Sequence, residues 1–373
     1  MTAEPPAIPL LDLGAQYREI GAELEAAVLR VLRSGRYVLG ETVARFEEAV
    51  AEHLGVRHAI GVASGSDALL LALMALEVRP GDEVVTSPFS FFATAAAIVR
   101  LGATPVFADI DPEDFGLSTA SIRLTERTRA LMPVHLYGQC GDMRTLDAIA
   151  RRHRLPIVED AAQAIGASRD GWRVGDGDLA CLSFYPTKNL GAAGDAGLVV
   201  TGDDALAARV RRLRTHGAES RYEHLEVGLN SRLDAVQAAI LTVKLKHLDR
   251  WNEARRARAA VYDELFRAAG LAGEVSLPAV AVGSTHVFHQ YVVRVPQREA
   301  LRAHLAARGI ASEVYYPIAL HLQPCFASLG YHRGDLPEAE RAADEVLALP
   351  IYPELERTAQ ERIVAAVREF HGR

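Results

Sequence analysis

Residues 179–191 read Leu-Ala-Cys-Leu-Ser-Phe-Tyr-Pro-Thr-Lys-Asn-Leu-Gly, an apolar run followed by a polar loop that contains Lys188. The run over 179–184 predicts a buried strand. A lysine just past a buried strand is partly desolvated, which lowers the pKa of its ammonium group and favours the nucleophilic amine. Only three of the 41 basic residues are lysines, so arginine supplies positive charge nearly everywhere else. We therefore expect Lys188 to act as an amine, which a guanidinium cannot do, rather than as a surface charge in a loop.

Short apolar runs alternate with helical patterns on both sides of this stretch. Their spacing is typical of βαβ units, so we expect a mostly parallel sheet covered by helices. The expected strands are residues 58–63, 83–86, 104–108, 130–134, 156–158, 179–184 and 197–200.

The chain is too long for one hydrophobic core, because 373 residues exceed what a single core usually holds. A helical pattern at about 231–269 is interpreted as a bridge to a second lobe. We therefore expect a large domain over 1–248 and a smaller C-terminal α/β domain over 249–373. The small domain is expected to contain strands at 288–295 and 312–316 and helices at 298–308, 338–347 and 358–370.

Three other segments place candidate ligand-binding residues at the ends of expected strands, where open parallel sheets bind their ligands. Asp160 suits a protonated ring nitrogen, or it caps the next helix. The turn Ser64-Gly65-Ser66 precedes an apolar helix, and such a helix start suits a phosphate unless the serine is only a cap. Phe91 is expected to stack on a flat ring, with core packing as the alternative.

Composition excludes several classes of function. The net charge is −7, the pI is about 6.0 and no block of basic residues occurs, which argues against nucleic acid or an anionic membrane as a partner. No apolar run approaches a membrane span, and the N-terminus lacks the pattern of a secretory signal. Cys140, Cys181 and Cys325 form no CxxC pair, so we expect no disulfide framework, no metal site and a cytoplasmic location.

Many short stretches, in the same order, resemble the DegT/StrS family of sugar aminotransferases, which are fold-type I enzymes dependent on pyridoxal 5'-phosphate (PLP). The resemblance covers nearly the whole chain. Its fold is an α/β large domain, with a mostly parallel mixed sheet covered by helices, and a smaller C-terminal α/β domain. The matching stretches are residues 9–13, 65–69, 80–84, 102–106, 134–138, 159–163, 189–191, 194–195, 230–234, 316–317 and 321–323.

The resemblance implies a role for each candidate residue. Lys188 would hold PLP as a Schiff base and move protons, and Asp160 would bind the pyridine nitrogen. The other expected cofactor-binding residues are Gly65, Ser66 and Ser183 for the phosphate, Phe91 for the ring, Gln163 for the phenolic oxygen, and Asn230 from a partner subunit. Tyr185, Tyr316 and His321 are candidates for the substrate pocket.

The resemblance further implies a homodimer that transfers an amino group from L-glutamate to a nucleotide-linked sugar. The lysine loop and residues 230–234 are most similar to the subgroup that acts on 3-keto-6-deoxyhexoses, with dTDP as the expected nucleotide. The cofactor would alternate between PLP and pyridoxamine phosphate.

Several alternatives remain open at this point. Within PLP chemistry these are amination at C4, another nucleotide-linked ketosugar, or a sugar dehydratase, although a dehydratase of this family carries histidine in place of Lys188. A dinucleotide-binding oxidoreductase is disfavoured because Gly191, Gly194 and Gly197 form GxxGxxG rather than GxGxxG. A regulatory protein with a PLP-enzyme fold is the third alternative.

Overall fold

The computed structural model describes residues 6–271 and 273–372 of the chain. The α-helices among these residues are α1 (Leu13–Ser34), α2 (Glu41–Leu54), α3 (Gly65–Ala75), α4 (Ala93–Arg100), α5 (Met143–His153), α6 (Asp204–Leu213), α7 (Ala235–Leu245), α8 (Leu248–Ala268), α9 (Arg298–Ala306), α10 (Pro337–Glu345) and α11 (Arg357–Phe370). The strands are β1 (His58–Val62), β2 (Glu83–Thr86), β3 (Thr104–Phe107), β4 (Thr128–Met132), β5 (Val158–Asp160), β6 (Ser168–Arg169), β7 (Trp172–Arg173), β8 (Leu179–Ser183), β9 (Gly197–Thr201), β10 (Ala218–Ser220), β11 (Glu223–His224), β12 (Ser284–Thr285), β13 (Tyr291–Arg294) and β14 (Val346–Leu349).

The central sheet runs in the order β3-β2-β4-β5-β8-β9-β1. Strands β1-β9-β8-β5 and β3-β2-β4 form two ladders, which parallel bridges between Leu131 and Ile157 and between Val134 and Asp160 join. Every neighbouring pair is parallel except those of β9, which is antiparallel to both β8 and β1. The mostly parallel mixed sheet expected from the sequence is therefore confirmed.

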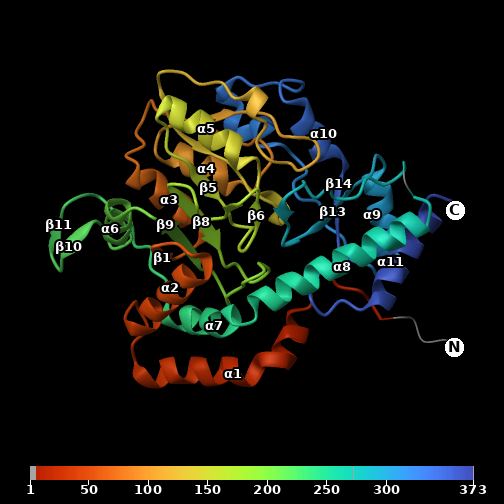
Figure 1. The fold of residues 1–373 in the computed structure, drawn as a ribbon, viewed down its shortest axis with the longest axis horizontal. Helices are drawn as coiled ribbons and strands as arrows, with labels where there is room; N and C mark the ends of the chain where they lie inside the picture. The colour runs from red at the N-terminus through yellow and green to blue at the C-terminus, as the bar shows by residue number, and fades with distance from the viewer. Residues whose placement is uncertain (1–5, 272, 373) are drawn as a thin grey trace.

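Helices cover both faces of this sheet (Figure 1). Helix α3 packs against β8 and β9 with α4 and α6 beside it, and its sequence is apolar on nearly all sides because it is buried between these elements. Helices α1, α2 and α7 pack together on the opposite face, below the sheet in Figure 1. Both faces are covered, which explains why every residue of β9 and β2 is buried.

Helix α8 leads from the sheet to a second hydrophobic core (Figure 1). That core combines Tyr262 and Phe266 of α8 with buried residues of β13, α9, β14 and α11. Ile8 also packs into it, so the N-terminal segment contributes to the second core. A domain boundary at residue 248 stays a prediction, although α8 begins there.

Outside the central sheet, the structure corrects three of the expectations drawn from the sequence. The helical pattern at 231–269 is two helices, α7 and α8, separated at Lys246 and His247. The expected helix at 338–347 ends at Glu345, and Val346–Leu349 forms strand β14 paired antiparallel to β13. The expected strand at 312–316 is wrong, because this segment forms only an isolated bridge between Glu313 and Ala348.

Two further expectations concern the chain as a whole. None of the helices in residues 6–271 and 273–372 is long and apolar enough to cross a membrane. Cys140, Cys181 and Cys325 are free thiols, and the first two are buried.

Candidate active site

A helix start and a strand end form a tight cradle. Ser64 caps α3, because its Oγ accepts a hydrogen bond of 3.1 Å from the backbone N–H of Asp67. Gly65, the first residue of α3, lies against the half-buried Ser183 at the end of β8, and a Cβ at Gly65 would stand 2.6 Å from the Ser183 Cβ. Only glycine fits at this contact. Backbone N–H groups at a helix start beside a hydroxyl form an anion site, with the exposed Ser66 in the same turn.

Asp160 ends β5 as a buried carboxylate. Its Oδ2 accepts a hydrogen bond of 2.6 Å from the Thr94 hydroxyl, and its Oδ1 accepts a longer one of 3.3 Å from the Ala162 N–H. Burial raises the pKa of Asp160, while the Thr94 hydrogen bond and the Lys188 charge act in the opposite direction. A buried carboxylate with one short hydrogen bond suits a cationic partner such as a protonated ring nitrogen.

Lys188 follows β8 and lies near this carboxylate. Its backbone N–H donates a hydrogen bond of 2.8 Å to the Tyr185 carbonyl, which shapes the loop. Burial lowers the pKa of the Lys188 ammonium to about 8, and the charge of Asp160 raises it. A substantial fraction of this amine is therefore neutral near pH 8, as the sequence argument expected of a nucleophile.

The structure also brings Gln163, Tyr316 and Phe91 together. The Gln163 Oε1 accepts a hydrogen bond of 2.7 Å from the Tyr137 N–H, and its Nε2 donates one of 3.1 Å to the Tyr316 hydroxyl. The rings of Tyr316 and Phe91 lie 6.0 Å apart. Phe91 is 57% exposed, so its ring is accessible to a ligand.

The remaining substrate candidates differ in their surroundings. Tyr185 is 53% exposed on the lysine loop. His321 is fully buried, where its Nε2 lies 3.1 Å from the Glu340 carboxylate and its ring contacts Phe107 and Tyr331. A side chain that lined an open site would be reached by water, so the structure gives His321 the surroundings of a packing residue.

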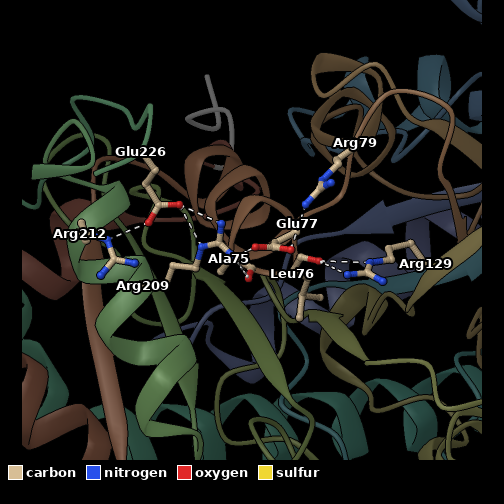
Figure 2. A network of polar contacts seen from close by, with 8 residues as sticks. All are labelled: Ala75, Leu76, Glu77, Arg79, Arg129, Arg209, Arg212 and Glu226. Atoms are coloured by element: carbon tan, nitrogen blue, oxygen red, sulfur yellow. Dashed lines mark hydrogen bonds and ion pairs between the residues drawn. The ribbon is translucent and has the colours of Figure 1, made fainter. Parts of the chain in front are cut away.

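Asn230 is exposed and follows a hairpin, β10–β11, that extends away from the sheet (Figure 1). Figure 2 shows how the segment between the hairpin and Asn230 is fixed: Glu226 accepts hydrogen bonds of 2.9 Å from Arg209 and 2.8 Å from Arg212. Arg209 also donates a hydrogen bond of 2.8 Å to Glu77, which lies just after the end of α3. The segment that carries Asn230 is therefore tied to the helix whose first turn forms the cradle.

Sequence reasoning missed the residues that support the site. Thr94 and Ser90 form a buried hydroxyl pair, 2.7 Å apart, behind Asp160. The buried Lys244 donates a hydrogen bond of 2.7 Å to the Gly191 carbonyl, so this lysine holds the backbone of the loop that carries Lys188.

Comparison with known proteins agrees with this geometry. The model of the DegT/DnrJ/EryC1/StrS aminotransferase family matches residues 18–368. A pleiotropic regulatory protein of Geobacillus stearothermophilus is 51% identical over 367 residues, which cover 98% of each chain. The dTDP-3-amino-3,4,6-trideoxy-alpha-D-glucose transaminase of Streptomyces venezuelae is 48% identical over 374 residues, which cover 100% of this chain and 98% of the transaminase. The crystal structure of S. venezuelae DesV in complex with a ketimine intermediate has a TM-score of 0.94 and 47% identity, covering 99% of this chain and 100% of DesV. This chain therefore belongs to the DegT/DnrJ/EryC1/StrS aminotransferase family and is an aminotransferase.

Proposed function

We propose that the chain uses PLP to transfer the amino group of L-glutamate to C3 of a dTDP-linked 3-keto-6-deoxyhexose in amino-sugar biosynthesis. The observation that carries the proposal is a lysine with a pKa of about 8, beside a buried carboxylate, at the carboxyl edge of the sheet. The similarity to the S. venezuelae transaminase supports the choice of nucleotide and of carbon.

The residues of the site fit PLP. The cradle of Gly65 and Ser183, which a Cβ would fill, suits the phosphate, with Ser66 in the adjacent turn. Asp160 suits the ring nitrogen, and the exposed ring of Phe91 suits the ring face. When bound, PLP supplies an electron sink for the carbanion formed at the donor carbon.

The side chains around the ring would control protons. Because the pKa of Lys188 is about 8, its amine both accepts and releases a proton near neutral pH. Gln163 is held by Tyr137 and directs its N–H toward the Tyr316 hydroxyl, a donor that also suits the phenolic oxygen of PLP. Tyr185 and Tyr316 would contact the sugar, and His321 would act only through packing.

A homodimer is part of the proposal, with Asn230 reaching the phosphate in the partner's site. The hairpin segment supports it, because Tyr222, Leu225 and Val227 are apolar and 84%, 58% and 89% exposed. Mixing Lys188→Arg and Asn230→Ala chains tests this arrangement, since each mixed dimer would contain one intact site. We expect recovery of about a quarter of the wild-type activity from two inactive preparations, whereas separate sites would recover none.

The reaction itself is tested with purified chain, PLP, L-glutamate and the dTDP-linked 3-keto sugar. We expect glutamate to bleach the visible band of the lysine-bound cofactor and the sugar to restore it, with NMR placing the new amine on C3. Lys188→Arg should abolish the band, and Lys246→Arg is the matched control because Lys246 is an exposed surface lysine.

Other products would redirect the proposal. An amine on C4 would keep the transaminase and change the sugar. A deoxy product formed without loss of glutamate would indicate a dehydratase. A cofactor band that no donor bleaches would favour a regulatory role, as the name of the Geobacillus relative suggests for that protein.

A further inference from the structure

Two buried hydroxyl groups stand in line behind Asp160. The Thr94 Oγ1 donates a hydrogen bond of 2.6 Å to the Asp160 Oδ2, and the Ser90 Oγ lies 2.7 Å from the Thr94 Oγ1. All three residues are buried, so the two hydroxyls cannot take their hydrogen bonds from bulk water. The line therefore reaches from the carboxylate into the protein interior rather than to the surface.

The direction of both hydrogen bonds follows from the number of protons. A hydroxyl carries one proton, and the proton of Thr94 is the one donated to Asp160. The Thr94 oxygen can therefore only accept at its contact with Ser90, which makes the Ser90 hydroxyl the donor. The Ser90 hydroxyl makes no other hydrogen bond within residues 6–271 and 273–372, so its effect on Asp160 passes through Thr94.

The same turn carries the residue that is expected to stack on the cofactor ring. Phe91 follows Ser90 in the chain, and its carbonyl accepts a hydrogen bond of 3.2 Å from the N–H of Thr94, the second residue of α4. The Ser90 and Thr94 hydroxyls close this turn inside the protein, while Phe91 is exposed. The turn therefore connects the two contacts expected for PLP, the ring face at Phe91 and the ring nitrogen at Asp160.

We propose that Ser90 is a positioning residue for the ring nitrogen of the cofactor, because it donates to the Thr94 hydroxyl that holds Asp160. The proposal deepens the proposed function, on which it rests. The Thr94 hydroxyl and the Ala162 N–H bind different oxygens of the Asp160 carboxylate, at 2.6 and 3.3 Å, so together they fix its plane. A hydroxyl that itself accepts a hydrogen bond is polarised and donates more strongly, which is how Ser90 would strengthen the hold on the carboxylate.

Other ionisable groups near Asp160 stay unaltered in the test. Burial raises the pKa of Asp160, whereas the Thr94 hydrogen bond and the charges of Lys188 and His135 lower it. Burial and the charge of Asp160 raise the pKa of Tyr316 and of Cys181. Because a donor to the carboxylate favours the ionised form, loss of a hydroxyl from the line should raise the pKa of Asp160.

The readout is the pKa of Asp160 in the cofactor-free chain, measured by NMR of protein labelled with ¹³C at the aspartate carboxyl and assigned with Asp160→Asn. Thr94→Val should raise this pKa by about one to two pH units, the loss expected for a hydrogen bond to a charged group. Ser90→Ala should raise it by about 0.2–0.5 pH units, the share expected of cooperative strengthening. Ser87→Ala is the matched control and should leave it unchanged, because the buried Ser87 hydroxyl bonds to the backbone of Phe89 instead.

A double variant tests whether Ser90 acts through Thr94. In Thr94→Val the Ser90 hydroxyl has lost its acceptor, so adding Ser90→Ala should raise the pKa of Asp160 no further. Thr94→Ser keeps the hydroxyl and should retain the wild-type pKa. In the loaded enzyme, kcat for the glutamate half-reaction should fall in Thr94→Val and less in Ser90→Ala, while Ser87→Ala leaves it unchanged.

Three NMR results would overturn the proposal: an unchanged pKa in Ser90→Ala, an equal change in Ser87→Ala, or additive changes in the double variant. If a variant fails to fold, neutron diffraction of the unaltered, deuterated chain decides. A Ser90 deuterium directed at the Thr94 Oγ1 supports the inference, and one directed elsewhere contradicts it. Failure of the wild-type chain to bind PLP would refute the proposed function, while the NMR result would still decide whether Ser90 supports Asp160.

Discussion

The cradle at Gly65 predicts a measurable clash when a single methyl group is added. In Gly65→Ala the new Cβ would stand 2.6 Å from the Ser183 Cβ and 3.2 Å from its Cα, whereas carbon atoms in contact lie about 3.5–4.0 Å apart. Overpacking of this kind costs about 1–3 kcal/mol, and the stiffer unfolded chain offsets about 0.4–1 kcal/mol. We therefore expect a net destabilisation of about 1–2 kcal/mol, together with the loss of PLP binding.

Urea unfolding of the cofactor-free chain at one fixed protein concentration measures the first effect, and titration with PLP measures the second. Gly202→Ala is the matched control, because a Cβ at Gly202 meets nothing within 4 Å. Ser183→Gly removes the two closest atoms, so the double variant Gly65→Ala with Ser183→Gly should be more stable than the sum of the single effects predicts. A coupling of about 0.5–3 kcal/mol is expected for residues in direct contact.

Two results would refute the reasoning about the cradle. If Gly65→Ala were as stable as Gly202→Ala, α3 and β8 would not meet as the structure shows. If Gly65→Ala were destabilised but bound PLP with unchanged affinity, the cradle would be a packing contact and the phosphate would bind elsewhere.

Three further predictions concern single groups of the site. The rate of PLP capture, followed by stopped-flow absorbance, should rise with pH and level off above about pH 8, because the depressed pKa of Lys188 makes the neutral amine predominant there. A rate that continued to rise up to about pH 10, where an ordinary lysine titrates, would contradict this prediction. Thr94→Val removes the hydroxyl that donates to Asp160 and should destabilise the cofactor-free chain at pH 7 by about 1–3 kcal/mol in thermal unfolding; an unchanged melting temperature would show that Asp160 does not depend on it. His321→Asn should lower the melting temperature because it leaves Glu340 without its buried partner, with KM for the sugar nucleotide changed less than about twofold; a large rise in KM at constant stability would return His321 to the substrate pocket.

The helices and strands whose bounds were predicted most accurately end at residues that are typical of helix or strand ends. The helical pattern over residues 41–54 predicts the bounds of α2, because Gly55 adopts the left-handed conformation, φ 69°, that ends a helix. Strand β14 was missed because Val346–Leu349 is a short apolar run, and such a run fits the end of a buried helix or a buried strand equally well. Its antiparallel pairing with β13, about fifty residues away, decides between the two and leaves no local trace.

The same distinction between local signals and distant contacts applies to the site, where some residues face the ligand and others support them. Lys188 and Asp160 were predicted because each lies within a few residues of the end of an apolar run, and parallel strands carry such residues to one edge of the sheet. Their supporting residues were not predicted, since Thr94 and Asp160 are 66 positions apart and Gly191 and Lys244 are 53 apart. Side chains that meet at these separations do so only through the packing of whole elements, which one sequence without its fold does not specify.

Burial of the ionisable groups at the site costs folding free energy, and the proposed cofactor would reduce this cost. Asp160 is buried with a raised pKa, so its folded-state pKa exceeds the unfolded value and its ionised form destabilises the fold at neutral pH. Lys188 is affected in the opposite direction, because burial disfavours its ammonium form, and each group partly offsets the burial of the other. A ligand with a cationic ring nitrogen and an anionic phosphate would compensate Asp160 and the helix start at Gly65 together, while its carbonyl would consume the neutral amine. The residues that make the cofactor-free chain less stable would therefore be the ones that give PLP its binding energy, which is the relation expected of a preorganised site.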